Sequence, residues 1–431
     1  MSSPLHRERL EQKLAAAAEP RARHVFTRLL PDTARAEADA ADLRRRAGIP
    51  LGPLDGRIIS IKDLFDMAGQ VTTAGSVILK DQPPASADAP TVAALRRAGA
   101  ILIGRTNMSE FAFSGIGLNP HYGTPGNAID PARVPGGSTS GGAVSVALGL
   151  ADLTLGTDTG GSTRIPAAFN GIVGFKPTSS RVSRTGAFPL SYTLDSIGPL
   201  GPDVESCAAM DAILAGIDPE ALPELPLAGL RLGIPQGLLF EDTEAPVAEA
   251  FEKSISRLSA WGAHVGELSI DDLILAMRGV LATAPIAACE AAEIHREWLE
   301  SRAADFDARV LARIRPGISI SAPAYIATLR ERERLKSTFS RRLAPYDALI
   351  LPTCALQAPP IAALEADPDL FARKNMLALR NTNPANFFDC PALSVPLPVS
   401  GMPVGLMLLG APMQDRRLLA LGAAIEAALK P

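Results

Sequence analysis

Two short glycine and serine clusters decide the fold: PGGSTSGG at residues 135–142 and GTDTGGSTRIP at residues 156–166. Both lie between Gly123 and Gly174, the most glycine-dense region of the chain, and apolar segments separate them. A glycine pair lets the backbone turn sharply and lets a substrate carbonyl approach, because no Cβ stands in the way. Each cluster has a serine directly after such a pair, Ser138 and Ser162. We interpret both as nucleophile loops.

The same clusters do not fit the common nucleotide-binding loops. No Gly-Lys-Ser or Gly-Lys-Thr follows them at the spacing of a phosphate-binding loop, and their glycines lack the spacing of a dinucleotide fingerprint. The apolar segments between the clusters also argue against a flexible linker. The glycines are therefore expected to shape a buried backbone.

Outward from the clusters towards the N-terminus, strand and helix patterns alternate. Residues 5–48 are rich in Ala, Arg, Glu and Leu at helical spacing, which predicts one or two peripheral helices. A short β-branched strand is expected at residues 57–61, a helix at 90–98 and another short strand at 100–103. This alternation is typical of an α/β protein.

Towards the C-terminus the pattern changes twice. A strand is predicted at residues 230–234, and residues 244–345 have an almost wholly helical pattern. Strands are expected again at 348–352, 392–396 and 404–409, before a closing helix at 414–429.

Composition and charge argue against several classes of protein. The net charge is −4 and basic residues are spread along the chain, so no basic surface for nucleic acid is expected. The four cysteines lie far apart without a C-x-x-C pair, which argues against a zinc site and a disulfide framework. Residues 1–20 lack an apolar signal core, and the weakly polar stretch 141–156 is too short to span a bilayer. We expect a cytoplasmic protein with no membrane partner.

A serine nucleophile needs a base, and histidine is the usual one. The five histidines lie outside both clusters; only His121 is near them in sequence, and a loop or pocket role suits it better. Lysine is the alternative, provided that burial lowers its pKa from about 10.4 towards roughly 7 or 8. Lys62, at the end of the predicted apolar strand, is placed for such burial. By itself it would also suit a structural ion pair.

Together these motifs resemble those of the amidase signature family. The resemblance rests on Lys62-Asp63, on both clusters, and on the 24 residues that separate Ser138 from Ser162. It extends to GRTNMSEF at 104–111, GFKPT at 174–178, LDSIGP at 194–199 and PALSVP at 391–396. Similarity is clear over residues 51–205 and 345–428.

The resemblance implies a fold and a domain plan. It predicts one large three-layer α/β/α domain with a mixed central sheet, spanning residues 1–431. Within it we distinguish N-terminal peripheral helices (1–50), a catalytic core with both loops (51–205), a variable and mostly helical region (206–344), and C-terminal strands and a helix that complete the core (345–431).

The resemblance also implies roles for individual residues. Ser162 would form the acyl-enzyme, and Ser138, after a cis peptide bond from Gly137, would pass protons between Ser162 and Lys62. The backbone N–H groups of Thr159, Gly160, Gly161 and Ser162 would form the oxyanion hole, at a loop entering a helix. Supporting roles are expected for Asp158 and Arg164, which would fix the loop, and for Ser140. Met108, Phe111 and Phe188 are candidate pocket residues, although a plain core role suits them equally.

The implied activity is hydrolysis of a linear amide C–N bond in a small carboxamide, with no metal and no cofactor. Three alternatives stay open: the glutaminase A subunit of a tRNA-dependent amidotransferase, a carbamate or allophanate-type hydrolase, and a non-catalytic anion-binding module. The same three side chains would serve both enzymatic alternatives, so they do not discriminate between them. The oligomeric state is also open, with a homodimer as one option.

Overall fold

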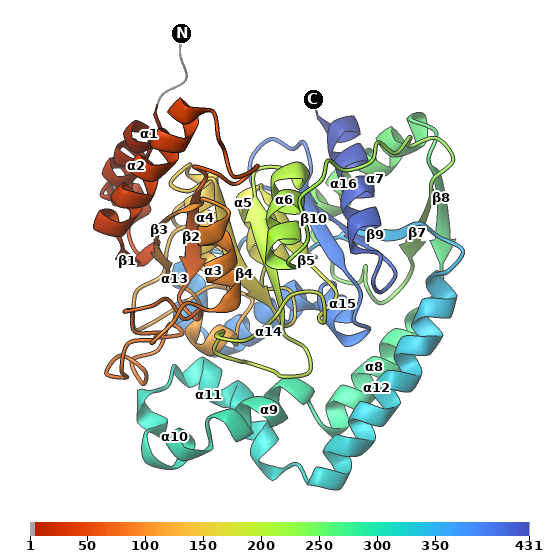
Figure 1. The fold of residues 1–431 in the computed structure, drawn as a ribbon. Helices are drawn as coiled ribbons and strands as arrows, with labels where there is room; N and C mark the ends of the chain where they lie inside the picture. The colour runs from red at the N-terminus through yellow and green to blue at the C-terminus, as the bar shows by residue number, and fades with distance from the viewer. Residues whose placement is uncertain (1–4, 431) are drawn as a thin grey trace.

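The computed structural model describes residues 5–430 and contains one large β-sheet with helices on both faces (Figure 1). The strands are β1 (Phe26–Leu29), β2 (Ile58–Lys62), β3 (Ile101–Thr106), β4 (Leu153–Asp158), β5 (Val173–Lys176), β6 (Ser196–Gly201), β7 (Arg231–Pro235), β8 (His264–Leu268), β9 (Ala348–Pro352), β10 (Ala392–Pro396) and β11 (Gly405–Leu409). The α-helices are α1 (His6–Ala17), α2 (Pro31–Ala47), α3 (Pro90–Arg97), α4 (Ser140–Ala147), α5 (Arg164–Asn170), α6 (Val204–Leu214), α7 (Ala245–Ala260), α8 (Asp271–Thr283), α9 (Ile286–Ile294), α10 (Arg296–Ser301), α11 (Ala308–Ile314), α12 (Ala322–Leu343), α13 (Ile361–Ala366), α14 (Pro368–Arg380), α15 (Asn383–Phe387) and α16 (Asp415–Leu429).

The sheet is mixed, and its strand order is β1-β3-β2-β4-β6-β5-β10-β11-β9-β7-β8. Strand β2 runs parallel to both of its neighbours, β3 and β4, while β4, β6, β5, β10, β11 and β9 form an antiparallel series. Antiparallel pairing of β5 with β10 joins the two halves of the chain in one sheet. The predicted α/β fold with a mixed central sheet is confirmed.

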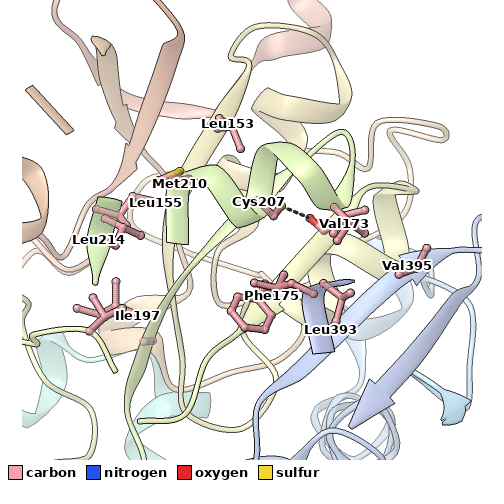
Figure 2. Packing of buried hydrophobic residues seen from close by; sticks show 14 of the residues in the cluster. Leu153, Leu155, Val173, Phe175, Ile197, Cys207, Met210, Leu214, Leu393 and Val395 are labelled. Carbon is pink, nitrogen blue, oxygen red and sulfur yellow. Dashed lines mark hydrogen bonds between the residues drawn. The ribbon is translucent and has the colours of Figure 1, made fainter. Parts of the chain in front are cut away.

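Successive side chains of each central strand point to opposite faces of the sheet. Leu153 and Leu155 of β4 and Ile197 of β6 belong to the largest apolar cluster, together with Cys207 and Met210 of α6 (Figure 2). Leu200 of β6 instead packs with residues of α4 and α5, namely Ala143, Val146 and Ala167. Helices α3, α6, α16 and α7 therefore form one layer, and α4 and α5 belong to the other.

Two predicted helical regions each contain a strand that the sequence pattern did not predict. Strand β1 lies between α1 and α2, and β8 lies between α7 and α8. These two strands are the two edges of the sheet, and their residues are only partly buried. An edge strand has one hydrogen-bonded neighbour, so its sequence carries a weaker apolar pattern than a central strand.

One stretch, Asp271–Ile294, is long and apolar enough to span a membrane by length and composition alone. In the structure it is divided into α8 and α9, with Ala284 and Pro285 between them. Several of its apolar side chains line the cavity described below.

Candidate functional site

Lys62 is the last residue of β2, a strand that lies between β3 and β4 in the sheet. Its side chain is fully buried, and its Nζ lies 2.7 Å from Ser138 Oγ and 2.8 Å from Thr157 Oγ1. Burial lowers the pKa of Lys62 to about 7, against the opposing effect of the nearby carboxylates of Asp195 and Asp158. A lysine in this state can lose its proton near neutral pH and then accept one from a hydroxyl.

Ser138 lies on the first cluster, just before α4, and the peptide bond that joins it to Gly137 is cis, as the resemblance predicted. Its backbone is held by neighbouring segments, because Ser109 N–H donates to Ser138 O at 3.2 Å and Gly137 N–H donates to Gly115 O at 2.8 Å. The side chain is fully buried. Its hydroxyl is therefore fixed beside the Lys62 amine.

Ser162 lies on the loop between β4 and α5, the second cluster. The two clusters touch, since Thr139 N–H donates to Ser162 O at 3.3 Å. Ser162 is 4% exposed and lines a large cavity. The structure thus brings the three residues predicted as nucleophile, relay and base to the end of β2 and the adjoining loops.

The loop that carries Ser162 is held by Asp158, the last residue of β4. Asp158 Oδ1 accepts hydrogen bonds from Gly161 N–H (2.8 Å) and Arg164 Nη2 (2.9 Å), and Oδ2 accepts from Thr163 N–H (3.0 Å). Burial raises the pKa of Asp158, but the charge and hydrogen bonds of Arg164 outweigh it and hold the pKa well below its usual range. Both residues are fully buried, which fits the structural role predicted for them.

Four backbone N–H groups are predicted to form the oxyanion hole, and they differ in whether they already donate a hydrogen bond within the protein. The N–H of Gly161 is engaged by Asp158 Oδ1 at 2.8 Å. Among residues 5–430, none accepts a hydrogen bond from the N–H groups of Thr159, Gly160 or Ser162. Thr159, Gly160 and Ser162 also line the cavity. These three N–H groups are therefore free to donate to a ligand atom.

A second buried carboxylate, that of Asp195, supports the same loop. Its Oδ1 accepts from Thr159 Oγ1 at 2.5 Å, and its Oδ2 accepts from the N–H groups of Leu190 and Ser191, each at 3.0 Å. Burial raises the pKa of Asp195. The negative charge of its ionised form raises the pKa of Lys62, which couples this residue to the proposed base.

The cavity in front of Ser162 has a volume of about 1160 Å³. Its walls come from the 112–115 segment, from α8 and α9, and from α14 and α15. They are largely apolar, with Leu190, Leu194 and Ile286 among the lining side chains. A cavity of this size and lining is typical of a small-molecule site.

The remaining predicted residues lie around the site without lining this cavity. Met108 is fully buried, and Phe111 and Phe188 belong to an aromatic cluster in which their ring centroids are 5.4 Å apart. Ser140, the first residue of α4, donates from its hydroxyl to Asn107 O at 3.2 Å.

Sequence reasoning missed three residues of the site. Thr157 and Asp195 lie within two motifs that the sequence analysis identified, GTDTGGSTRIP and LDSIGP. The motifs did not predict that Thr157 contacts Lys62 or that Asp195 contacts Thr159. Asn386 of α15 bridges Asp158 and Arg164, accepting from Arg164 Nη2 at 2.8 Å and donating to Asp158 Oδ1 at 2.9 Å. It lies 222 residues from Arg164, and no local pattern marks it.

Comparison with known proteins matches this architecture over nearly the whole chain. A family model described as Amidase matches residues 8–419. The A subunit of the glutamyl-tRNA(Gln) amidotransferase of Symbiobacterium thermophilum is 37% identical, and the match covers 91% of this chain and 87% of that one. AtzE, a 1-carboxybiuret hydrolase subunit of Pseudomonas sp. (strain ADP), is 34% identical, with coverage of 94% and 90%.

A solved structure described as an amidase superposes with a TM-score of 0.89 at 36% identity, covering 99% of this chain and 97% of that one. Three observations agree with one another: the sequence match, the shared fold, and the presence of Lys62, Ser138 and Ser162 in one site. The chain therefore belongs to the amidase family, whose members are amidase-signature hydrolases of C–N amide bonds.

Proposed function

We propose that this protein hydrolyses a small carboxamide through an acyl-enzyme on Ser162, with Ser138 as proton relay and Lys62 as base. The observation that carries the proposal is the 2.7 Å contact between Lys62 Nζ and Ser138 Oγ, at a lysine whose burial lowers its pKa to about 7. Membership of the amidase family supports the reaction class.

Acylation would begin with neutral Lys62. Ser162 Oγ attacks the amide carbonyl carbon, its proton passes to Ser138 Oγ, and the proton of Ser138 passes to Lys62 Nζ. The carbonyl oxygen becomes an oxyanion. The unengaged N–H groups of Thr159, Gly160 and Ser162 would stabilise it, since preorganised donors in a dry site act strongly on developing charge.

Collapse of the tetrahedral intermediate would break the C–N bond. The Lys62 ammonium returns its proton through Ser138 to the leaving nitrogen, so that ammonia or an amine departs and an ester remains on Ser162. Water then loses a proton through the same relay and attacks the ester. The second collapse reprotonates Ser162, releases the carboxylic acid and leaves Lys62 neutral for the next cycle.

Single substitutions test these roles. Ser162→Ala should abolish amide hydrolysis, and Lys62→Ala and Ser138→Ala should each lower kcat by at least about 1000-fold, because relay and base act in the same steps. Ammonia or amine release from a panel of aliphatic, aryl, carbamate and glutamine amides is the measurement.

A matched control is Ser145→Ala, because Ser145 is a buried serine of α4 that contacts Ser60 Oγ at 2.9 Å and lies outside the relay. A fluorophosphonate probe with intact-mass analysis gives a second readout, in which the adduct should appear on Ser162. Undiminished turnover of the Ser162 variant would contradict the proposal. A protein that resists the probe and hydrolyses no amide would instead favour a non-catalytic anion-binding module.

A second candidate function is that of a glutaminase that passes ammonia to a partner protein. The observation that favours it is the 37% identity to the A subunit of a glutamyl-tRNA(Gln) amidotransferase over 91% of this chain. Glutaminase activity that appears only after addition of the partner proteins would identify this function. Three further proposals concern a carbamate or allophanate-type substrate, a homodimeric state and a cytoplasmic location. The substrate panel tests the first, light scattering tests the second, and cell fractionation tests the third.

A further inference from the structure

Glu290, in α9, is a buried carboxylate whose hydrogen-bond partners are uncharged. Its Oε2 accepts from Ser191 Oγ and, at 3.2 Å, from Thr193 N–H, and its Oε1 accepts from the hydroxyls of Thr193 and Tyr325. Among residues 5–430, no basic side chain forms an ion pair with it. Burying a carboxylate without a cation is costly unless hydrogen bonds compensate, so these donors and the carboxylate hold one another in place.

The donors to Glu290 come from two distant parts of the chain. Ser191 and Thr193 belong to residues 190–195, here called the 190–195 turn, which directly precedes β6, and Tyr325 belongs to α12. The turn is closed by its own hydrogen bonds, in which Asp195 N–H donates to Ser191 O at 3.0 Å. Ser191 lies 99 residues from Glu290. Glu290 therefore ties a turn of the catalytic core to the helical region.

The 190–195 turn carries several groups of the active site. Leu190 and Leu194 line the cavity in front of the nucleophile. Asp195, the last residue of the turn, accepts from the N–H of Leu190 at 3.0 Å and from Thr159 Oγ1 at 2.5 Å. Thr159 in turn offers one of the unengaged N–H groups of the predicted oxyanion hole. A displacement of the turn would thus move both the cavity wall and a support of the oxyanion loop.

We propose that Glu290 is a positioning residue of the active site: through the hydroxyls of Ser191 and Thr193 it holds the 190–195 turn, so that Asp195 supports the oxyanion loop. This inference rests on the proposed amide hydrolysis at Ser162. Glu290 itself is not among the described residues that line the cavity, so it acts through the turn and not by contact with a substrate. A group misplaced by about 1 Å can cost about 100-fold in rate, which makes such an anchor effective at a distance.

Few titratable groups surround Glu290. Arg332 of α12 and the neighbouring Cys289 interact with it only through space, and Arg332 donates instead to Phe387 O at 2.8 Å. Burial and the hydrogen bond to Glu290 raise the pKa of Tyr325 to about 12, so its hydroxyl stays a donor at neutral pH. The anchor is therefore a set of hydroxyl groups around one carboxylate.

Any effect of Glu290 on the titration of the base should pass through Asp195. Burial lowers the pKa of Lys62, and the carboxylates of Asp195 and Asp158 are the charges that oppose this effect. An Asp195 that is held less firmly would act more weakly on Lys62. The pH at which kcat/KM reaches half its maximum would then move to a more acidic value. A purely structural role of Glu290 would not move this midpoint.

The substitution Glu290→Gln tests the anchor. Glutamine keeps the shape of the side chain but replaces one acceptor oxygen with a donor group, so some of the hydroxyl groups lose their acceptor. We expect kcat to fall at least about 10-fold on any amide that the wild type cleaves, together with an acidic shift of the midpoint. Initial rates measured across neutral pH give both values, and urea unfolding shows that the variant is folded.

Further variants separate position from charge. Glu290→Asp keeps the charge but withdraws the carboxylate by one methylene group, so it should show a comparable loss. Glu293→Gln removes an exposed glutamate of the same helix, paired with Arg296 at 3.1 Å, and should behave as the wild type. The double variant Glu290→Gln with Asp195→Asn should have the same midpoint as Asp195→Asn alone. Thr193→Val removes one donor with Glu290 in place and should give the same acidic shift, so it replaces Glu290→Gln if that variant does not fold.

The outcomes separate this inference from the proposed function. Wild-type kinetics of Glu290→Gln, or a lower kcat with an unmoved midpoint, overturns the positioning role and leaves the amidase function standing. Wild-type kinetics of Glu290→Asp would assign the effect to charge alone and also overturn it, as would a further shift of the midpoint in the double variant. Unchanged turnover in Ser162→Ala would instead overturn the proposed function.

Discussion

Within the part of the chain that the structure describes, no carboxylate is in direct contact with the Lys62 amine. Its two hydrogen-bonding neighbours are hydroxyls, Ser138 at 2.7 Å and Thr157 at 2.8 Å, and the carboxylates of Asp195 and Asp158 act on it only through space. Hydroxyl partners satisfy the amine without strongly favouring its charged form, so desolvation decides the pKa. This distinguishes a proton acceptor from a structural ion pair.

The activity should therefore follow the protonation state of Lys62. A protonated Lys62 cannot accept a proton, so kcat/KM should rise with pH around a midpoint of about 7 and level off above it. Initial rates between about pH 5 and about pH 9 measure this. A flat profile through neutrality, with amide cleavage as the slow step, would contradict the role of Lys62.

The substitution Asp195→Asn should move the midpoint of this pH profile in a defined direction. The ionised Asp195 carboxylate raises the pKa of Lys62, so its neutral isostere should lower that pKa further and move the midpoint to a more acidic pH. The change also disturbs the hydrogen bond from Thr159, so kcat is expected to fall. A purely structural role would lower kcat and leave the midpoint where it was.

At the scale of elements, the loop from β4 to α5 is held in place from both sides. Asp158 and Arg164 fix its two ends from inside the protein, and Thr382 Oγ1, between α14 and α15, donates to Gly160 O at 2.6 Å. A loop held in this way keeps its N–H groups in place before the substrate arrives.

Gly161→Ala should break this arrangement. Gly161 has a φ of +142°, and a Cβ built there would lie 2.3 Å from Thr382 Oγ1 and 2.7 Å from Ile165 Cδ1. The loop would have to shift, and a shift of about 1 Å next to the nucleophile should lower kcat by about 100-fold or more. Steady-state kinetics of the folded variant measure the loss.

Gly171→Ala is the matched control for that substitution. Gly171 also has a positive φ, +70°, at the end of α5, but the closest atom to its Cβ would be 3.4 Å away. It should lower the free energy of unfolding by about 1 kcal/mol and leave kcat near the wild-type value. Equal kinetic losses in the two variants would show that backbone strain, and not the position of the loop, governs activity.

At the scale of the whole molecule, the helices between α8 and α12 pack aromatic side chains against the core. His295, at the end of α9, is fully buried there among Phe111, Phe188, Trp298 and Phe306, and its centroid is 4.2 Å from that of Phe111. Among the described residues neither of its ring nitrogens has a hydrogen-bond partner. Burial lowers the pKa of His295 to about 4.

This histidine should make the fold sensitive to mild acid. The unfolded chain binds a proton at this residue below about pH 6.5, whereas the folded protein does so only near pH 4, so stability should fall between these values and level off below them. The difference corresponds to about 3 kcal/mol in the free energy of unfolding.

His295→Phe removes this titration and should flatten the dependence of stability on pH in that range. Urea unfolding at about pH 7 and about pH 5 measures it. His264→Gln, at an exposed histidine of β8, is the control and should follow the wild type. A wild-type dependence retained in His295→Phe would assign the acid sensitivity to other groups.

Much of the fold follows from local pattern. The strands expected at 348–352 and 392–396 are β9 and β10 with the same bounds, and the closing helix at 414–429 is α16 to within one residue. Central strands are buried on both faces, so their apolar runs are strong. The edge strands β1 and β8 have no such signal, because their pairing depends on β3 and β7 and not on their own residues.

Local sequence patterns are enough to predict the α/β class, the two glycine and serine loops, and the short set of side chains from which a nucleophile and a base could come. Tertiary structure alone decided which of these meet. Lys62 and Ser138 are 76 residues apart, and Asn386 lies 222 residues from the arginine it holds. The lowered pKa of Lys62 likewise arises from burial by distant segments, and desolvation is a property of the packed molecule that no local stretch of sequence contains.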